Sequence, residues 1–278
     1  GAARSRGEIL FFIDADVVVP PRAMDMVVNA FKDEPHIDAL FGSYDDEPGE
    51  PNFFSQYRNL LHHFVHQHAR EDASTFWGAC GAIRRDVFLS IGGFNERYSR
   101  PSIEDIELGL RLKKAGGRIR LAKSLQVKHL KRWDLGSMLR ADVFQRALPW
   151  TELILRERNL INDLNTSISG RASVVLTFIL VGVLLLSFRE PFALAGVGAI
   201  AVILLLLNVT LYRFFLKKRG WRFAVRSILA HWLYFIYSGA AFAIGTVLHG
   251  INPKRLQDIH SSARMEGRKT AASHMERR

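Results

Sequence analysis

The sequence predicts an α/β domain followed by a membrane-associated helical region, and three observations lead to this prediction. Short apolar runs alternate with amphipathic stretches from residue 1 to about residue 130, as in α/β domains. Three longer apolar runs follow, at 172–188, 191–212 and 227–248. A helix of 22 residues reaches about 33 Å, close to the ~30 Å hydrocarbon core of a bilayer. With 48% hydrophobic and 23% charged residues, the 278-residue chain is also too apolar to be a disordered tail.

The composition excludes several classes of protein. A single cysteine, Cys80, excludes a disulfide framework and any multi-cysteine zinc or iron–sulfur site. Lys and Arg number 38 against 27 acids, and this net charge of +11 predicts an anionic partner: nucleic acid, a phosphorylated substrate or a lipid surface. We expect no nucleic-acid partner, because no helix-turn-helix, zinc-finger or RNA-binding aromatic motif accompanies the charge. A transporter is disfavoured because the apolar runs contain no acidic residue.

The first elements follow from periodicity and from turn residues. The apolar run 8–13 predicts a strand that is covered on both faces, and it ends in Asp14-Ala-Asp16. Two prolines then lead into a helix over 22–32 with one apolar face. The next strand is expected at 37–43, followed by an exposed loop at 44–52 that is rich in Asp, Glu, Pro and Gly.

The rest of this half continues the alternation. A helix is expected over 53–70, where His62 and His66 have the i, i+4 spacing of a metal site; without a third ligand, a polar helix face is favoured. The remaining expected elements are a small-residue strand or turn at 77–83, a short helix closed by Gly92-Gly93, a helix at 104–115 stopped by Gly116-Gly117, and two strand pieces within 118–127.

Residues 111–158 contain 13 Lys or Arg against four acids, interleaved with apolar residues. This pattern predicts an amphipathic helix in a membrane interface, although a basic helix packed on the domain remains open. The basic residues of 213–222 predict a cytoplasmic loop after the second span, which places Arg189 and Glu190 outside and the α/β domain inside. A third span would put a tail with seven basic and three acidic residues outside, against this rule, unless the third segment bends back near Ser238-Gly239.

Asp14 and Asp16 are candidate ligands of a hard cation. Ligands of open α/β sheets bind beyond the carboxyl ends of strands, where these two residues are expected. Two carboxylates separated by one residue can both approach Mg²⁺ or Mn²⁺, whose remaining ligands would be phosphate oxygens and water. The alternative is a solvated turn.

Two further groups of residues could contribute chemistry. Glu104-Asp105, at a helix start, could supply a general base that takes a proton from an acceptor hydroxyl, although acids at this position also simply cap helices. In the sequence 129–133, Arg132 could grip a diphosphate, and Trp133 could offer a flat face to a sugar ring. A tryptophan that anchors the chain at a membrane interface is the competing interpretation.

Five motifs in order resemble those of one family. They are Asp14-Ala-Asp16 after an apolar strand, Gly78-Ala-Cys-Gly-Ala-Ile-Arg-Arg85, Gly92-Gly-Phe94, Glu104-Asp105 and the His-x-x-Arg-Trp of 129–133. Over about residues 1–165 the chain resembles membrane-associated family 2 glycosyltransferases, many of which carry carboxy-terminal membrane spans. The resemblance lies in the order and spacing of the motifs rather than in any one of them.

The resemblance implies a GT-A type, Rossmann-like mixed sheet and inverting transfer of a sugar from a nucleotide-sugar donor. It implies that Asp14 and Asp16 hold Mg²⁺ or Mn²⁺ and the nucleotide diphosphate, and that Asp105 is the catalytic base with Glu104 in support. It also assigns substrate binding to Arg132 and Trp133. The acceptor pocket would be lined by the segment that contains Gly78, Ala79, Cys80 and Gly81.

Two departures from the family pattern matter. His129 replaces a Gln, which puts processive synthesis in doubt, and the family's first strands are absent before Gly1. We therefore expect an amino-terminal truncation and a fragment that alone is inactive, because it would lack much of the donor pocket. The expected division is a partial catalytic domain at 1–133, an amphipathic interface region at 134–168, about three transmembrane helices at 169–250 and a basic tail at 251–278.

These observations lead to one functional hypothesis and two alternatives. The first is a multi-pass membrane glycosyltransferase of the cell envelope, with a cytoplasmic catalytic domain and a membrane-proximal glycan or glycolipid acceptor. The second is an enzyme that transfers sugar to a polyprenyl phosphate, whose anionic oxygen needs no base. The third, from another class, is a non-catalytic basic membrane-anchored binding protein.

Overall fold

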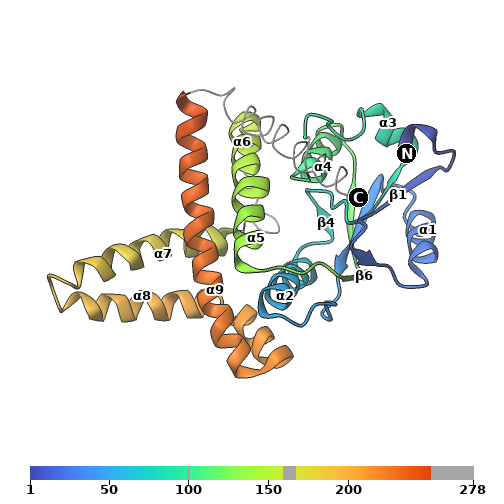
Figure 1. The fold of residues 1–278 in the computed structure, drawn as a ribbon. Coiled ribbons are helices and arrows are strands. Elements are labelled where there is room, and N and C mark those ends of the chain that lie inside the picture. The colour runs from blue at the N-terminus through green and yellow to red at the C-terminus, as the bar shows by residue number, and fades with distance from the viewer. Residues whose placement is uncertain (99–100, 159–166, 252–278) are drawn as a thin grey trace, which may run out of the picture.

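The computed structural model describes residues 1–98, 101–158 and 167–251 (Figure 1). A sheet flanked by helices occupies one side of the molecule, and long apolar helices occupy the other. A short 3₁₀ turn at Ala2–Arg4 precedes the first strand.

The sheet has six strands in the order β1-β5-β3-β6-β2, with β4 pairing with β6 off this path. Strands β3 and β6 are parallel and all other pairs are antiparallel, so the mixed α/β sheet that we predicted is confirmed. The strands are β1 Ile9–Ile13, β2 Val17–Val18, β3 Ala39–Tyr44, β4 Asp72–Ala73, β5 Cys80–Arg84 and β6 Ile119–His129.

Two strands differ from the expectation. Strand β6 is one strand of 11 residues rather than two pieces, and its register against β3 shifts between Phe41 and Ser43. Gly42 lies at the shift, where a Cβ would come within 2.2 Å of the Leu125 carbonyl oxygen. Strand β1 lies at the sheet edge, since within the described residues it pairs only with β5, and only its Leu10 is buried. Its side chains nevertheless pack on both faces, Leu10 and Phe12 with one core and Ile9 and Phe11 with the other, so the predicted cover is present but partial.

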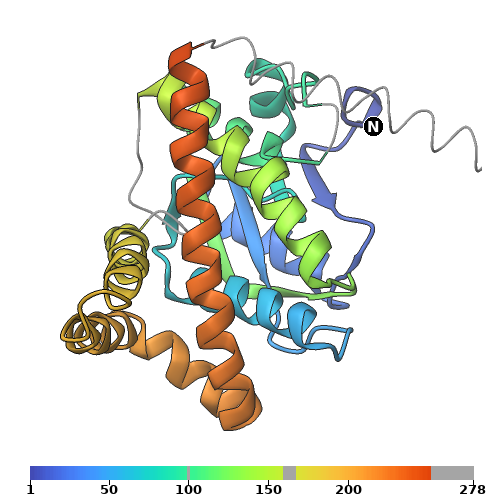
Figure 2. The same ribbon diagram turned by 60° about the vertical axis from the view of Figure 1, so that its left-hand side comes forward.

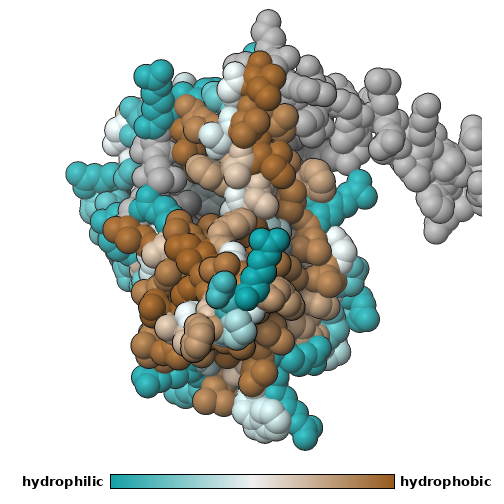
Figure 3. Space-filling model, turned by 90° about the vertical axis from the view of Figure 1, so that its left-hand side faces the viewer, coloured by the Kyte–Doolittle hydropathy of each residue, from teal (hydrophilic) through white to brown (hydrophobic). Residues whose placement is uncertain are grey.

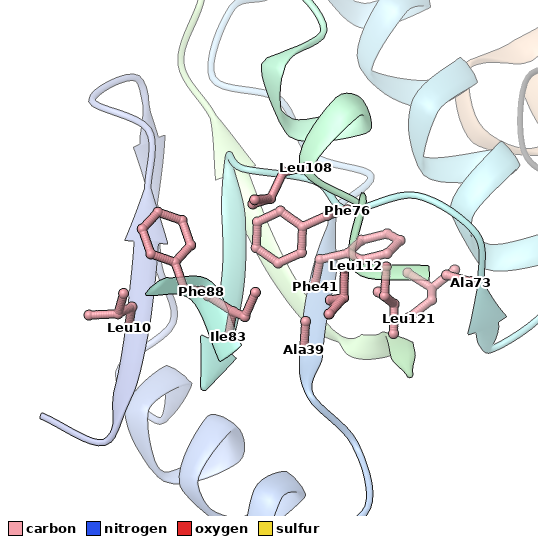
Figure 4. Packing of buried hydrophobic residues seen from close by; sticks show 11 residues of the cluster. Leu10, Ala39, Phe41, Ala73, Phe76, Ile83, Phe88, Leu108, Leu112 and Leu121 are labelled. Atoms are coloured by element: carbon pink, nitrogen blue, oxygen red, sulfur yellow. The ribbon is translucent and has the colours of Figure 1, made fainter. Parts of the chain in front are cut away.

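Each face of the sheet is covered by helices. Helix α1 (Ala23–Asp33) packs Val27 and Phe31 onto one face, against Leu40 and Cys80. Helices α3 (Arg85–Ser90) and α4 (Glu104–Lys114) cover the other face, as Figure 4 shows. The core on this second face contains Leu10, Ala39, Phe41, Ala73, Phe76, Ile83, Phe88, Leu108, Leu112, Ile119 and Leu121. Each fully buried Leu or Phe contributes about 1.5–3 kcal/mol, so this layer holds α4 firmly against the sheet.

Helix α2 (Phe53–His68) packs His63 and His66 inward and leaves His68 exposed, which corrects the expectation of a polar face formed by its histidines. His63 and His66 are buried, and their Nδ1 atoms lie 2.7 Å from the Tyr44 carbonyl oxygen and 3.2 Å from that of Gly42. The loop after β3 is also less exposed than expected, because the Asn59 amide donates to the Asp45 carbonyl oxygen. The histidines thus dock α2 on β3.

A long helical path follows the sheet. Helix α5 (Leu135–Arg140) begins at a capping box in which Asp134 and Ser137 satisfy each other's backbone N–H groups, and it continues through a π-helical segment, η2 (Ala141–Ala147), into α6 (Leu148–Glu157). Leu153 of α6 packs with Ile103 and Leu110 beside α4. The basic amphipathic region is thus packed on the domain along one side, and its placement in a membrane interface stays a prediction.

The remaining helices are apolar. They are α7 (Ile168–Leu186), α8 (Ala193–Leu207) and α9 (Val209–Ile251), and α9 turns sharply at Gly220, where φ is 79°. Helices α7 and α8 lie side by side as a hairpin that projects away from the sheet, as the views in Figures 1 and 2 agree. By length and composition, α7 and α9 could each span a membrane, whereas α8 is a shorter apolar helix. The predicted basic tail lies outside the described residues, apart from Ile251.

Candidate functional site

Asp14 and Asp16 occupy a turn between β1 and β2 at the carboxyl end of β1. The Asp14 backbone N–H donates to the Ala79 carbonyl oxygen (3.1 Å), and the Leu130 N–H donates to the Asp16 carbonyl oxygen (2.8 Å). These two bonds tie the turn to the segments that enter β5 and leave β6. The Asp14 side chain is exposed and that of Asp16 is partly exposed, so both carboxylates are available to a ligand.

Glu104 and Asp105 begin α4 on the other side of the same sheet end. The Gly78 N–H donates to Asp105 Oδ2 (3.0 Å) and the Ile106 N–H donates to Oδ1 (2.7 Å), while the Ser102 N–H donates to Glu104 Oε2 (2.7 Å). Burial raises the pKa of Asp105 to about 6; the Gly78 N–H opposes this rise and the Glu104 carboxylate adds to it. A half-buried carboxylate of this pKa, fixed by two donors, has the properties of a general base near neutral pH.

The four acids gather at one place. The segment Gly78-Ala79 connects the two pairs: the Ala79 carbonyl oxygen accepts from the Asp14 N–H (3.1 Å), and the Gly78 N–H donates to Asp105 Oδ2 (3.0 Å). Burial raises the pKa of Asp14, and the carboxylates of Asp16 and Glu104 raise it further. That these acids act together on a substrate stays a prediction.

The cations beside these acids are not the ones we expected. Lys131 Nζ lies 3.7 Å from Asp16 Oδ2, and Lys131 and Arg146 both lower the pKa of Asp14. Arg146, on η2, also lowers the pKa of Asp105. Arg132 instead pairs with Glu50 (2.9 Å), and its side chain is 70% exposed. For Arg132 to bind a diphosphate as predicted, its ion pair with Glu50 would therefore have to break.

Trp133 does not present a free face. Its side chain is buried, and its ring lies between the Arg58 guanidinium (4.2 Å) and Lys131 Nζ (4.6 Å). Its backbone N–H donates to the Ser55 hydroxyl (2.7 Å). The predicted contact between Trp133 and a sugar ring disagrees with this packing, because cations already cover the indole; Trp133 attaches the start of α5 to α2.

A cluster of three rings lies next to Asp16, formed by Tyr44, Trp77 and His129. Tyr44 stacks on His129 with 4.2 Å between centroids and meets Trp77 edge-on at 4.8 Å. Burial lowers the pKa of His129 to about 4, so this histidine is neutral at pH 7. Its Nε2 lies 3.9 Å from Asp16 Oδ2, which places an uncharged ring beside the carboxylate.

Of the predicted acceptor segment, Gly78 is the part closest to the acids. Ala79, Cys80 and Gly81 are buried at the start of β5, with Cys80 fully covered in the core under α1. Gly81 has a packing role, because a Cβ there would come within 2.4 Å of the Phe76 ring. The side chains of these three residues are therefore not available to a substrate in this structure.

The acids fit a divalent metal only with help from a ligand. In the part of the chain that the structure describes, no three His, Cys, Asp or Glu side chains form a group that could hold a metal ion alone. Mg²⁺, however, is commonly bound by one or two carboxylates together with substrate phosphates. The hard oxygens of Asp14 and Asp16, and the mutual repulsion that raises the pKa of Asp14, suit such an ion.

Comparison with known proteins identifies the family. Residues 9–249 match the family model described as Glycosyl transferase family group 2. The chain belongs to this family. Among solved structures it is similar to the mannosyltransferase PcManGT from Pyrobaculum calidifontis, in complex with GDP-Man and Mn²⁺, at 15% identity and a TM-score of 0.40. That match covers 95% of this chain and 63% of the other, so the chain spans less than two thirds of that protein's length. No curated protein matches the sequence.

Two charged residues of the site were not predicted from the sequence. Lys131 lies within the 129–133 motif, in which roles were assigned only to Arg132 and Trp133. Arg146 is one of 13 basic residues in 111–158, and nothing in the local sequence distinguishes it. Only the path of α5 and η2 across the sheet end brings Arg146 toward the acids.

Proposed function

We propose that this chain is the catalytic part of an inverting glycosyltransferase, which moves a sugar from a nucleotide-sugar donor to a hydroxyl of a membrane-proximal glycan or glycolipid. The observation that carries the proposal is the placement of Asp14 and Asp105 at one sheet end, where both are hydrogen-bonded to the segment Gly78-Ala79 and where Asp16 and Glu104 are close to them in the chain. Family membership over residues 9–249 supports glycosyl transfer as the reaction.

Asp14 and Asp16 would hold Mg²⁺ or Mn²⁺ together with the donor diphosphate. When bound, such an ion neutralises negative charge on the departing nucleoside diphosphate. Lys131 lies 3.7 Å from Asp16 and would bind a remaining phosphate oxygen. The charge of Arg146 lowers the pKa of Asp14, but its guanidinium lies 4.0 Å from Asp142, so Arg146 would have to turn toward the site to bind phosphate. A role for Arg132 stays a prediction, since its guanidinium would first have to leave Glu50.

Asp105 would act as the base. The acceptor oxygen attacks the anomeric carbon as the bond to the diphosphate breaks, and the hydroxyl proton passes to the Asp105 carboxylate. The Gly78 and Ile106 N–H groups hold this carboxylate in one orientation. Attack opposite the leaving group inverts the configuration of the anomeric carbon.

The acceptor would be presented at a membrane. Helices α7 and α9 are apolar and long enough to span one, and we propose that the α/β domain lies on its cytoplasmic side, within a cell envelope. The basic residues Arg213, Lys217 and Lys218 support this side, because cytoplasmic loops carry an excess of Lys and Arg.

Turnover of two variants tests the proposal. In membranes that contain the whole protein with Mg²⁺ or Mn²⁺, Asp16→Ala should abolish transfer to any acceptor. Asp105→Ala should lower turnover of a hydroxyl acceptor by ~10²–10⁴-fold, the usual contribution of a general base. Asp33→Ala, an exposed acid on α1, is the control.

The outcomes separate the alternatives. If Asp105→Ala leaves turnover unchanged and the sole product is a lipid-linked monosaccharide, the acceptor is a polyprenyl phosphate, which needs no base. If Asp16→Ala and Asp105→Ala both turn over as fast as the unaltered protein, the site is not catalytic. The non-catalytic basic membrane protein would then be the better description.

A further inference from the structure

The two apolar parts of the helical region differ in their contacts. Helices α7 and α8 pack mainly on each other; the Gly196 Cα, for example, lies close enough to Val183 that a Cβ would be 3.2 Å from its side chain. The Asn208 amide closes the base of this hairpin by donating to the Ser173 hydroxyl (3.0 Å). Most other apolar side chains of the hairpin face outward.

The part of α9 after Gly220 instead runs alongside helical elements of the α/β part, which are α2, η2 and α6. Phe223 meets Phe53 of α2, Tyr237 donates to Asp142 Oδ2 of η2 (2.6 Å), and a Cβ at Gly245 would be 2.9 Å from Thr151 of α6. Residues 223–245 cover about 33 Å of helix at 1.5 Å per residue. Figure 1 shows the end of α9 running beside α5 and α6 over this length.

These contacts include buried charge. Asp142, which accepts from Tyr237, also pairs with Arg58 at 2.7 Å, and both charged side chains are nearly covered. A helix that crossed the hydrocarbon core at 223–245 would draw Arg58, Asp142 and Arg146 into it as well. Charged side chains at the bilayer centre are costly, so these contacts disfavour a crossing by this part of α9.

The chain has already returned to the α/β domain before Gly220. Lys218 pairs with Asp46, and Arg219 donates to the Asp46 carbonyl oxygen and to the Gln56 side chain, each at 2.8 Å. Gly220, with φ of 79°, then permits the sharp turn into the rest of α9. The chain therefore enters and leaves the α7–α8 hairpin on the side where the α/β domain lies.

The outer face of this part of α9 is apolar and is continuous with the hairpin, as Figure 3 shows. Its exposed apolar side chains are Trp221, Val225, Leu229, Leu233, Phe242, Ile244, Val247 and Ile251. Arg222 and Arg226, both exposed, lie at its start. An apolar face flanked by basic side chains is typical of helices that lie in the interface of an anionic bilayer.

We propose that residues 221–251 of α9 lie flat along the surface of an anionic bilayer, parallel to α5–α6, and do not cross it. The α7–α8 hairpin is then the only inserted unit among the described residues, and Ile251 lies on the same side as the α/β domain. This inference rests on the membrane location within the proposed function and removes the conflict between a third span and the positive-inside rule.

A depth profile tests the proposal. Single cysteines replace Val225, Leu229, Leu233, Ile244 and Val247, which lie on one face of the helix, in the whole protein. Each is labelled with a fluorophore, and the protein is placed in vesicles of phosphatidylcholine and phosphatidylglycerol. Quenchers sit at the headgroup or at the middle of the acyl chain. Cys80 is buried, so the unaltered protein is the blank. Val181→Cys, on the hairpin, reports a deep position.

A flat helix gives headgroup-level quenching of similar strength at all five positions of α9 and mid-chain quenching only at Val181→Cys. A mid-chain maximum near Leu233→Cys, falling toward both Val225→Cys and Val247→Cys, overturns the proposal, and so does an absence of lipid quenching on α9 alone. If Val181→Cys is not quenched either, the membrane location fails, whereas the sugar-transfer assay is unaffected by that result.

A second measurement reports sidedness. In sealed vesicles of one orientation, an impermeant maleimide should label Ile251→Cys from the same side as Lys32→Cys, an exposed position on α1. Labelling of the two positions from opposite sides would mean that α9 crosses the bilayer, and it would refute the inference while leaving the catalytic site untouched.

Discussion

The α/β part and the helical part 168–251 arrange their polar and apolar side chains in opposite ways. In the first, apolar side chains point inward on both faces of a sheet, and four carboxylates gather at one sheet end. In the second, apolar side chains point outward, as on Ile179, Leu184, Val202 and Leu206. Large exposed apolar surfaces mark contact sites, so the difference teaches that the two parts suit different surroundings. In the proposed function these are water with a charged ligand for the first part and lipid for the second.

The two parts meet through a small charged connection. Arg58 of α2, Asp142 of η2 and Tyr237 of α9 join three elements that are far apart in the chain. The Arg58 guanidinium also lies over Trp133, at the start of the path that carries Arg146 to the acids. The connection therefore ties α9 to the α/β part, and substitutions can test how separate the two parts are.

The largest effect is expected from Asp16→Ala. Removal of this carboxylate takes away half of the proposed metal site, so transfer should be abolished. Retention in the membrane should not change, because the side-chain partners of Asp16 within the described residues, His129 and Lys131, belong to the α/β part. A fall in turnover is measured with radiolabelled donor, and extraction at high pH measures retention; reduced retention would show that the parts are coupled.

Asp142→Ala should break the connection between the parts. It leaves the nearly covered Arg58 without its partner, which costs about 3–5 kcal/mol when a buried pair is broken. The thermal unfolding midpoint in detergent should fall accordingly. The double variant Arg58→Met, Asp142→Leu should recover much of the loss, since it leaves no uncompensated charge. An unchanged midpoint for Asp142→Ala would show that the pair does not hold α9 in place.

A matched pair of arginine substitutions compares the apolar helices. Val181 on α7 and Leu233 on α9 are each 37% exposed. Val181→Arg should lower membrane insertion by ~2.5–3.5 kcal/mol, the cost at the centre of a span. Leu233→Arg should have a much smaller effect, because a guanidinium in the interface reaches the headgroups. The fraction resistant to high-pH extraction measures both, and equal losses would mean that α9 spans the bilayer.

The smallest effect concerns pH. Asp105 acts as a base only when ionised, and its pKa is raised to about 6, so kcat/KM should fall about tenfold per unit below pH 6 and level off above it. Asp33→Ala, an exposed acid on α1, is the control, and its pH profile should match that of the unaltered protein. A rate that is flat from pH 5 to pH 8 would contradict the role of Asp105 as base.

Much of the local structure was predictable from the sequence. Strand β1, helices α1, α2 and α4 and the glycine stop at Gly116, where φ is 85°, all agree with the sequence-based expectations. These features depend on side-chain periodicity and on backbone conformations of single residues, which act over a few positions. Asp14 and Asp105 are both hydrogen-bonded to the segment Gly78-Ala79, as the order of the motifs leads one to expect, and the roles of the four acids stay predictions.

The expectations that disagree with the structure concern burial and partners. Trp133 is covered by Arg58 and Lys131, and Cys80 lies in the core, although both are in motifs that we assigned to substrate. The histidine face of α2 is buried because the carbonyl groups of β3 accept its hydrogen bonds. No local sequence motif predicts these contacts.

The sequence by itself determined the polarity of each segment: which runs form strands, which form apolar helices, and where carboxylates follow a strand. Tertiary structure alone decided that Arg146 and Lys131, rather than Arg132, face the acids, and that α9 has a soluble neighbour along its length whereas the α7–α8 hairpin does not. The physical reason is that electrostatic and packing partners are chosen by proximity in space. Residues 90 or more positions apart, such as Asp142 and Tyr237, come together only when the whole chain has folded.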